Sequence, residues 1–148
     1  MTTFQTESVE RWEAEAKDLI YAHWQELGMD LDLEIAPDFG KMKMLEDLGM
    51  FKVITVREDM KLVGYLLAIV SKHLHYSTSP PMLIVDAYYV SPECRSGTGA
   101  KLIRYTEALA RQLDCIKVYF SCKVHRDHTK LFQALGYRLS DYAFIRRL

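Results

Sequence analysis

The chain has 148 residues, of which 49% are hydrophobic and 26% charged, and its formal net charge is −1 at pH 7. This length predicts one domain with a proper core, and the near-zero charge argues against a surface that recruits nucleic acid or membrane through net charge. Three cysteines, an odd count, predict free thiols in a reducing cytoplasm, and no apolar run is long enough to cross a membrane.

The first predicted element is a helix that begins after Ser8 and ends at Gly28. Serine is a favoured N-cap, and glycine is favoured just beyond a helix end. An apolar stripe at helical spacing contains Trp12, Ala16, Leu19, Ile20, His23, Trp24 and Leu27. We interpret this stripe as the face that packs on the core, with His23 as a packed histidine rather than a catalyst.

An acidic connection, residues 30–38, follows this helix. It is either a solvated loop or an acidic lip beside a cationic amine substrate, and the loop is favoured because acidic residues are common in loops. A second helix is predicted from near Pro37 to Gly49, since proline suits a first helical turn. Its expected inner face consists of Phe39, Met42, Leu45 and Leu48.

Two strands are predicted next, over residues 51–57 and from residue 62 to about residue 76. Residues 58–61 form the turn between them, so the pair is expected to be an antiparallel hairpin. Gly64 indicates a bulge within the second strand. Residues 77–81, which are rich in Ser and Pro, are expected to form a loop.

The most informative stretch is residues 85–103, which predicts a strand, a tight turn and the start of a helix. Gly97 and Gly99 let backbone N–H groups approach a ligand without interference from a Cβ atom. The following helix directs unpaired N–H groups at the turn, and Arg95 adds a forked cation. Such an arrangement is suited to a phosphate or pyrophosphate group. The alternative is an ordinary turn between a strand and a helix.

The last third of the chain predicts one more strand, one short helix and two closing strands. The strand covers residues 116–124, and its alternation places Val118, Phe120, Cys122 and Val124 on one face. The helix follows Asp127 as a candidate cap, directs Leu131, Phe132 and Leu135 inward, and ends at Gly136. The closing strands cover residues 137–139 and 142–147.

The stretch from Val90 to Ile103 resembles the acyl-CoA loop of the Gcn5-related N-acetyltransferase (GNAT) superfamily. The family pattern is Val-x-Pro-x-x-Arg, then Gly-x-Gly/Ala and a helix; here Gly97 lies two positions after Arg95, where the family spacing is three. Residues 131–137 resemble the family's C-terminal motif, Leu-Tyr-x-x-x-Gly-Phe. The order of elements fits the family along the whole chain, apart from a first strand, and the chain is also similar to small phage-encoded acetyltransferase-like proteins.

This resemblance implies an α/β (α+β) fold. Its central sheet is mixed, mostly antiparallel and splayed between two central strands, with helices on both faces, and residues 1–148 form one acyl-CoA-binding domain. The implied activity is transfer of an acetyl group from acetyl-CoA to a primary amine of a small molecule or protein, by direct attack in a ternary complex. No nucleic acid or membrane partner is expected, and a homodimer is left open. The alternatives are a non-catalytic CoA-binding protein and a virion or host-interaction protein with this fold.

The resemblance also implies which residues hold the cofactor. They are Tyr88, Tyr89 and Val90 on the splayed strand, Arg95, Ser96, Gly97, Thr98, Gly99, Ala100 and Lys101 in the loop and helix start, and His125 and Phe132 beyond it. His125 stands where the family often has an asparagine that bonds the pantetheine. Phe132 stands where the family's usual general acid is a tyrosine, and phenylalanine has no proton to give. Water would then protonate the thiolate, or catalysis has been lost.

Three residues are candidates for the general base. Asp86 is expected to share a strand face with Tyr88 and Val90, although it could instead be a structural carboxylate. His75 and Tyr76 are expected to reach the same cleft from the end of the preceding strand, together with His73 on the same side; the alternative is a solvated strand end. A histidine titrates in a suitable range for a base.

The sequence also contains a group of possible metal ligands. Cys122, His125 and His128 are three residues apart, and Cys115 lies upstream. Structural zinc sites normally show paired ligands, and no second pair of cysteines exists here. No metal is therefore expected.

Overall fold

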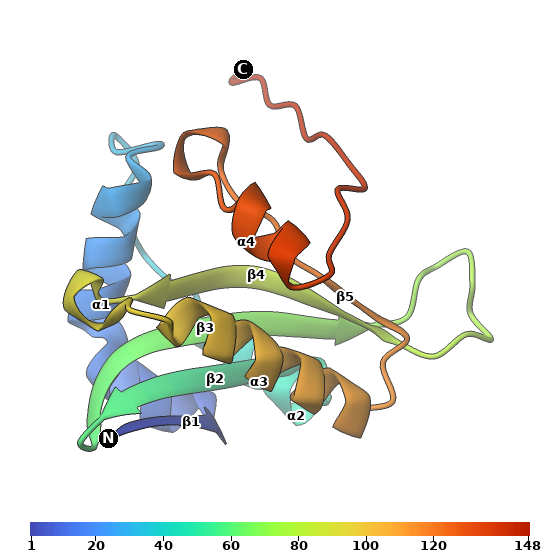
Figure 1. The fold of residues 1–148 in the computed structure, drawn as a ribbon, viewed down its shortest axis with the longest axis horizontal. Helices are drawn as coiled ribbons and strands as arrows, with labels where there is room; N and C mark the ends of the chain where they lie inside the picture. The colour runs from blue at the N-terminus through green and yellow to red at the C-terminus, as the bar shows by residue number, and fades with distance from the viewer.

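The computed structural model describes all residues from 1 to 148 as one mixed sheet with helices on both faces (Figure 1). The sheet has five strands in the order β1-β2-β3-β4-β5. The strands are β1 (Thr2–Glu7), β2 (Phe51–Glu58), β3 (Lys61–Ser71), β4 (Met82–Val90) and β5 (Lys117–Tyr119). All neighbours are antiparallel except β4 and β5, which are parallel. The predicted fold class is confirmed.

Two layers of helices cover the sheet. The α-helices are α1 (Val9–Leu27), α2 (Phe39–Asp47), α3 (Thr98–Gln112) and α4 (Thr129–Ala134), and two short 3₁₀ helices are η1 (Pro92–Cys94) and η2 (Val124–Arg126). Helices α1 and α2 pack on one face of the sheet, in a cluster that includes Trp12 and Phe39. Helix α3 packs on the other face through Leu102 and Ala110. No helix of this protein combines the length and apolar character needed to cross a bilayer.

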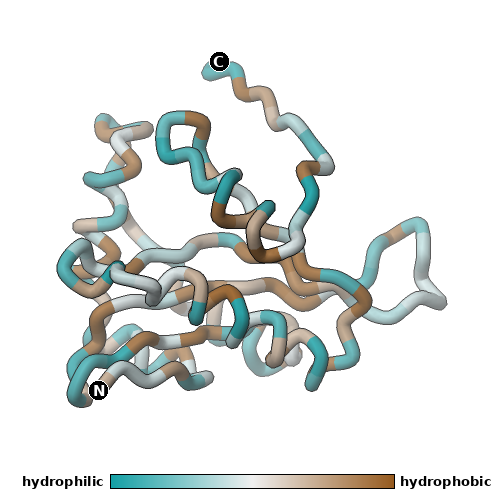
Figure 2. The backbone as a smooth tube through the Cα atoms, in the orientation of Figure 1, coloured by the Kyte–Doolittle hydropathy of each residue, from teal (hydrophilic) through white to brown (hydrophobic).

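The first helix begins and ends as the sequence predicts. The Ser8 hydroxyl accepts a hydrogen bond from the Arg11 N–H at 3.2 Å, and Gly28 adopts the left-handed conformation with φ of 64°. Trp12 and Ala16 are fully buried. Figure 2 shows hydrophobic residues concentrated along the central strands. Most of the stripe therefore packs on the sheet, as expected.

The second helix is shorter than predicted. It begins at Phe39, because the Asp38 carboxylate caps it by accepting from the Lys41 N–H at 2.9 Å. Pro37 therefore lies before the helix rather than in its first turn. Phe39, Met42 and Leu45 pack against the core as expected, but the helix ends at Asp47 and the Leu48 side chain is exposed.

Several predicted strand boundaries are wrong. Strand β3 ends at Ser71 rather than near Tyr76, and β5 contains only Lys117–Tyr119. Val124 is exposed and so does not continue the alternation of Val118 and Phe120. The segments 137–139 and 142–147 form no strand, because neither pairs with the sheet. Conversely, β1 is a polar edge strand that the sequence did not reveal.

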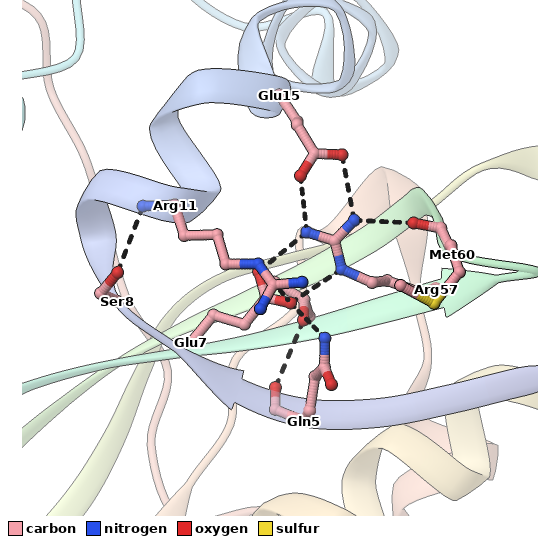
Figure 3. Close-up of polar contacts among 8 residues, drawn as sticks. Gln5, Glu7, Ser8, Arg11, Glu15, Arg57 and Met60 are labelled. Carbon is pink, nitrogen blue, oxygen red and sulfur yellow. Dashed lines mark hydrogen bonds and ion pairs between the residues drawn. The ribbon is translucent and has the colours of Figure 1, made fainter.

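A buried ion-pair network joins β1, α1 and the hairpin of β2 and β3 (Figure 3). The Arg57 guanidinium donates to both oxygens of Glu7 at 2.7 and 2.9 Å, to both oxygens of Glu15 at 3.0 and 2.8 Å, and to the Met60 carbonyl at 2.8 Å. Glu7 also accepts from the Gln5 amide. All five guanidinium N–H groups thus have an acceptor, which is the condition under which a charge is tolerated in a core.

The predicted bulge near Gly64 is confirmed. Val56 pairs with Gly64, whereas Arg57 pairs with Leu62, so Val63 is the extra residue in β3. Gly64 is needed because β4 passes very close: a Cβ at this position would lie 2.7 Å from the Tyr89 carbonyl oxygen. The absence of a Cβ at Gly64 therefore lets β3 and β4 approach each other where β4 enters the site described below.

Replacing Gly64 by alanine is expected to lower the free energy of unfolding by about 1–3 kcal/mol, the usual cost of overpacking, because the added methyl group meets backbone atoms of β4. Equilibrium unfolding in urea measures the effect. The matched control is Gly40→Ala in α2, where a Cβ would meet only the Asp38 carboxylate at 3.6 Å. That change should be neutral or stabilising by up to about 1 kcal/mol, given the helix propensities. Equal losses in both variants would contradict the close approach of the strands.

Candidate active site

The central opening of the molecule lies between β4 and β5. The two strands pair only through Met82, Leu83 and Ile84, which face Lys117, Val118 and Tyr119. From Val85 onward β4 has no partner on that side, because β5 ends and the chain rises to α4, while β4 continues toward the end of α1 (Figure 1). The backbone edge of residues 85–90 therefore has no strand partner on that side.

A cradle of free backbone N–H groups lies at the end of this edge. Gly97 precedes α3 with φ of 72°, and no side chain caps this helix. The N–H groups of Ser96, Gly97, Gly99 and Ala100 have no acceptor within the protein. Four donors that converge on a helix start form an anion-binding site, because the helix dipole adds to their partial positive charge.

The remaining predicted residues of the loop serve the loop itself. The Thr98 side chain is buried and its hydroxyl donates to the Cys94 carbonyl, which fixes the turn. Lys101, in the first turn of α3, is exposed, and its side chain makes no hydrogen bond or ion pair within the protein, although its backbone N–H donates to the Gly97 carbonyl. In the loop, the four free backbone N–H groups and the Lys101 side chain are thus available to a ligand. The Thr98 hydroxyl is not, because it is already hydrogen-bonded to the Cys94 carbonyl.

Arg95 does not extend freely over the loop as the sequence led us to expect. Its Nε donates to the Val90 carbonyl at 2.8 Å, and one terminal nitrogen lies 2.5 Å from the Glu26 carboxylate. The guanidinium also lies over the Tyr89 ring, 5.5 Å from its centre. The charge of Arg95 is therefore compensated by Glu26. Through these contacts the Arg95 side chain connects α1 to the end of β4.

Glu26 is a residue that the sequence analysis missed. Its carboxylate binds Arg95 and also lies 3.4 Å from Arg126 of η2. The hydrogen bond from Arg95 is the main reason why the pKa of Glu26 is lowered. His125 contributes to the same junction, since its Nε2 lies 2.7 Å from the Leu27 carbonyl. His125 thus contacts the end of α1, and its contact with a cofactor arm stays a prediction.

Aromatic rings line the opening on the side of α3 and α4. Phe132 packs against Phe120 at 5.1 Å, against Tyr137 at 5.6 Å and edge-on against Tyr88 at 6.5 Å between ring centres. The Tyr88 hydroxyl donates to the Ser121 carbonyl at 2.9 Å. Burial raises the pKa of Tyr88, so its hydroxyl stays protonated. Phe132 therefore lies beside Tyr88, Phe120 and Tyr137 and adds an apolar ring to this group, while its contact with a cofactor stays a prediction.

The opposite face of β4 carries a second aromatic group. Tyr89 is buried and stacks on His23, whose Nδ1 lies 2.7 Å from the Tyr65 hydroxyl. Burial lowers the pKa of His23 to about 4, so the ring is neutral at pH 7. The interpretation of His23 as a packed histidine agrees with this geometry.

Asp86 lies at a bulge in β4. Leu67 pairs with Ala87 and Ala68 with Val85, so Asp86 is the extra residue. As a result Val85, not Asp86, joins the cluster that contains Tyr88. The bulge interrupts the regular alternation of β4, so the expectation that Asp86 shares a face with Tyr88 and Val90 stays a prediction. Asp86 is nevertheless exposed at the start of the open edge.

His75 and Tyr76 lie far from this opening. Strand β3 ends at Ser71, which pairs with Met82 at the closed end of the β4–β5 pair. The following loop extends beyond that end (Figure 1). Its two histidine rings, His73 and His75, are 5.3 Å apart and both are outside the cleft. The prediction that His75 and Tyr76 reach the cleft is wrong, because the strand is shorter than its pattern indicated.

The sequence and the fold were compared with known proteins. A model of the Acetyltransferase (GNAT) family matches residues 6–137. No curated protein matches the sequence. Among solved structures, a ribosomal-protein-alanine N-acetyltransferase from Brucella melitensis biovar Abortus 2308 is similar, with 19% identity, a TM-score of 0.75 and coverage of 100% of this chain and 99% of the other.

Two further structures share the fold. An aminoglycoside acetyltransferase from an uncultured soil metagenomic sample, in complex with sisomicin, has 17% identity and a TM-score of 0.71, and the match covers 99% of this chain and 94% of the other. An aminoglycoside N-acetyltransferase in complex with CoA has 16% identity and a TM-score of 0.67, with coverage of 100% and 95%. These likenesses extend over the whole sheet and both helical layers.

Proposed function

Because the chain belongs to the acetyltransferase (GNAT) family, we propose that it transfers an acetyl group from acetyl-CoA to a primary amine. The observation that carries the proposal is that two unpaired stretches of backbone lie next to each other along the chain. They are the edge of β4 without a strand partner and the four free N–H groups before α3. An extended cofactor with amide groups in its arm and a pyrophosphate at its end matches both. The similar aminoglycoside N-acetyltransferase was solved with CoA, which supports this choice of cosubstrate.

Each part of the site has a role in this proposal. The N–H groups of Ser96, Gly97, Gly99 and Ala100 bind the pyrophosphate, and the β4 edge at residues 88–90 binds the cofactor arm and the thioester carbonyl. The neutral amine attacks the carbonyl carbon, the C–N bond forms, the C–S bond breaks and the thiolate leaves. Asp86, exposed beside the open edge, takes the proton of the amine directly or through one water.

The acceptor is proposed as a primary amine on a small molecule or a protein. The solved relatives include enzymes named for an aminoglycoside and for a ribosomal-protein alanine, which are two different classes of amine. The resemblance to phage-encoded proteins, the cytoplasmic location and the homodimer stay predictions.

A second candidate function is binding of CoA without catalysis. Phe132 favours it, because its apolar ring stands where the family has a proton donor. Titration of acetyl-CoA followed by an assay against a panel of amines separates the two functions. Binding with transfer supports the enzyme, binding without transfer supports the second candidate, and no binding contradicts both.

The Gly99→Asp variant should weaken CoA binding by about 10- to 100-fold, because it places a carboxylate among the donors that hold the pyrophosphate; this corresponds to the ~1–3 kcal/mol of an unfavourable polar contact. The fold tolerates the side chain, since a Cβ at Gly99 would meet only the Leu131 side chain at 4.0 Å. Gly99→Asn is the matched control, with the same volume and no charge. Calorimetry measures both affinities, and equal affinities for the two variants would contradict this placement of the pyrophosphate.

A further inference from the structure

One hydrogen bond crosses the opening between β4 and β5. The Tyr88 side chain leaves β4, and its hydroxyl donates to the carbonyl of Ser121, which lies beyond the end of β5, at 2.9 Å. The two strands have already separated here, because their last paired residues are Ile84 and Tyr119. A cofactor arm that lies along the open edge of β4 must therefore pass beside this hydroxyl or displace it from Ser121.

Two phenol groups touch the apolar ring of Phe132, and they face different surroundings. Tyr88 meets Phe132 edge-on, with its hydroxyl at the opening. Tyr137 packs on Phe132 at 5.6 Å, but its hydroxyl is buried without a hydrogen-bond partner, and burial followed by the charge of Glu107 on α3 raises its pKa. Only the Tyr88 hydroxyl is directed into the gap between the separated strands.

We infer that the Tyr88 hydroxyl is the group that stabilises the departing thiolate, in place of the hydroxyl that Phe132 lacks. This inference rests on the acetyl transfer proposed above. As the amine attacks, the C–S bond breaks and its electron pair stays on sulfur. The O–H of Tyr88 turns from the Ser121 carbonyl toward the sulfur and donates a hydrogen bond to the developing negative charge. The phenol keeps its proton, and the thiolate is protonated by solvent after release.

The surroundings of Tyr88 suit a donor of this kind. Its ring is fixed by Phe120 at 5.8 Å and by Phe132, both at steep angles, so the hydroxyl needs little reorganisation. Burial raises the pKa of the phenol, and the neighbouring Cys122 acts in the same direction. The hydroxyl therefore remains a donor over the whole range in which an amine loses its proton. In apolar surroundings such a bond is stronger than in water.

Steady-state kinetics of two matched variants tests the inference. Tyr88→Phe keeps the ring and removes only the hydroxyl, so it should lower kcat by about 100-fold, the lower end of the range for loss of one such donor, with CoA affinity within about threefold of the unaltered protein. Tyr137→Phe removes the other phenol beside Phe132 and should leave kcat within about twofold. The opposite order of effects would overturn the assignment.

A rescue experiment separates a chemical role from a structural one. Adding Phe132→Tyr to the Tyr88→Phe variant returns a hydroxyl to the same wall from α4, and kcat should rise by at least about tenfold. A merely structural loss would not be repaired in this way, so no rise overturns the inference. If the unaltered protein binds acetyl-CoA and transfers acetyl but Tyr88→Phe has normal kcat, only this inference fails. If the unaltered protein transfers no acetyl to any amine, the proposed function fails and the inference with it.

Discussion

Replacing Arg57 by methionine is expected to lower the free energy of unfolding by about 3–5 kcal/mol, because the change leaves a buried carboxylate without its partner. The side chains of Arg57 and Glu7 are only 3% and 2% exposed, and their ion pair joins β1 to β2. Methionine restores most of the volume, so the loss reports the stranded charge rather than a cavity. Equilibrium unfolding in urea measures it.

Two further variants separate the cost of the unpaired Glu7 charge from the contribution of the Glu15 ion pair. The double variant Arg57→Met, Glu7→Gln removes the stranded charge and should recover a large part of the loss. Glu15→Gln should cost less than about 1 kcal/mol, since the Glu15 side chain is 44% exposed and solvent screens its pairing. A loss below about 1 kcal/mol for Arg57→Met alone would mean that Glu7 finds water or another donor.

The same network has a consequence for acid stability. Burial alone would raise the pKa of Glu7, but hydrogen bonds from Arg57 and Gln5 outweigh it, so its pKa lies below the ordinary value of 4.5. The hydrogen bond from Arg57 likewise lowers the pKa of Glu15. A carboxyl group whose pKa is lower in the folded state than in the unfolded state stabilises the protein at pH values above its unfolded-state pKa. This stabilisation disappears as the pH falls from about 4.5 through the folded-state pKa. The free energy of unfolding, measured as a function of pH, should therefore be nearly constant near neutrality and decrease steeply in acid. The decrease should be shallower in the Glu7→Gln variant.

Replacing Asp86 by asparagine is expected to lower kcat by about 10²- to 10⁴-fold, the usual contribution of a general base, while CoA affinity stays nearly unchanged. The reason is its place: it is the bulged residue of β4, exposed where the strand edge becomes open. Asparagine keeps the shape and removes the ability to accept the proton of the amine. Steady-state kinetics with a saturating amine and acetyl-CoA measures the change.

The control for this variant is Asp114→Asn. Asp114 is also exposed, but it lies just beyond the end of α3 in a left-handed conformation that asparagine adopts readily. It should leave kcat within about twofold. If Asp86→Asn has the same small effect, then water accepts the proton or the amine needs no base of the protein. Asp86 would then be an ordinary solvated carboxylate.

Much of the fold was predictable because its signals are local. Ser8 and Gly28 mark the ends of α1, and Gly97 marks the start of α3, since each acts on backbone groups within one turn. Strand β1 was missed because Thr2–Glu7 is a mostly polar edge strand without an apolar alternation. The segment 142–147 has the residues of a strand but no pairing partner in the sheet, and strand propensity without a partner does not form a strand.

The site was only partly predictable for a related reason. The glycine turn is a local feature, so its position before α3 and at the end of β4 followed from the sequence. The partners of Arg95 did not, because Glu26 is 69 residues away and only the folded chain brings them together. The bulge at Asp86 was also hidden, since one extra residue changes the face of its neighbours without changing the composition of the strand.

The open edge of β4 links the stability of the whole protein to the supply of its ligand. The sheet separates after Ile84 and lacks cross-strand bonds to β5 along residues 85–90, where, in the complex proposed above, the amide groups of the cofactor arm would take the place of the absent strand. By mass action, a ligand at 100 times its dissociation constant adds about 2.7 kcal/mol to the folded state. For a chain of this size, that corresponds to a rise of roughly 5–11 °C in Tm. The thermal denaturation temperature of this protein should therefore rise with the concentration of free ligand relative to its dissociation constant, even after the cleft is saturated.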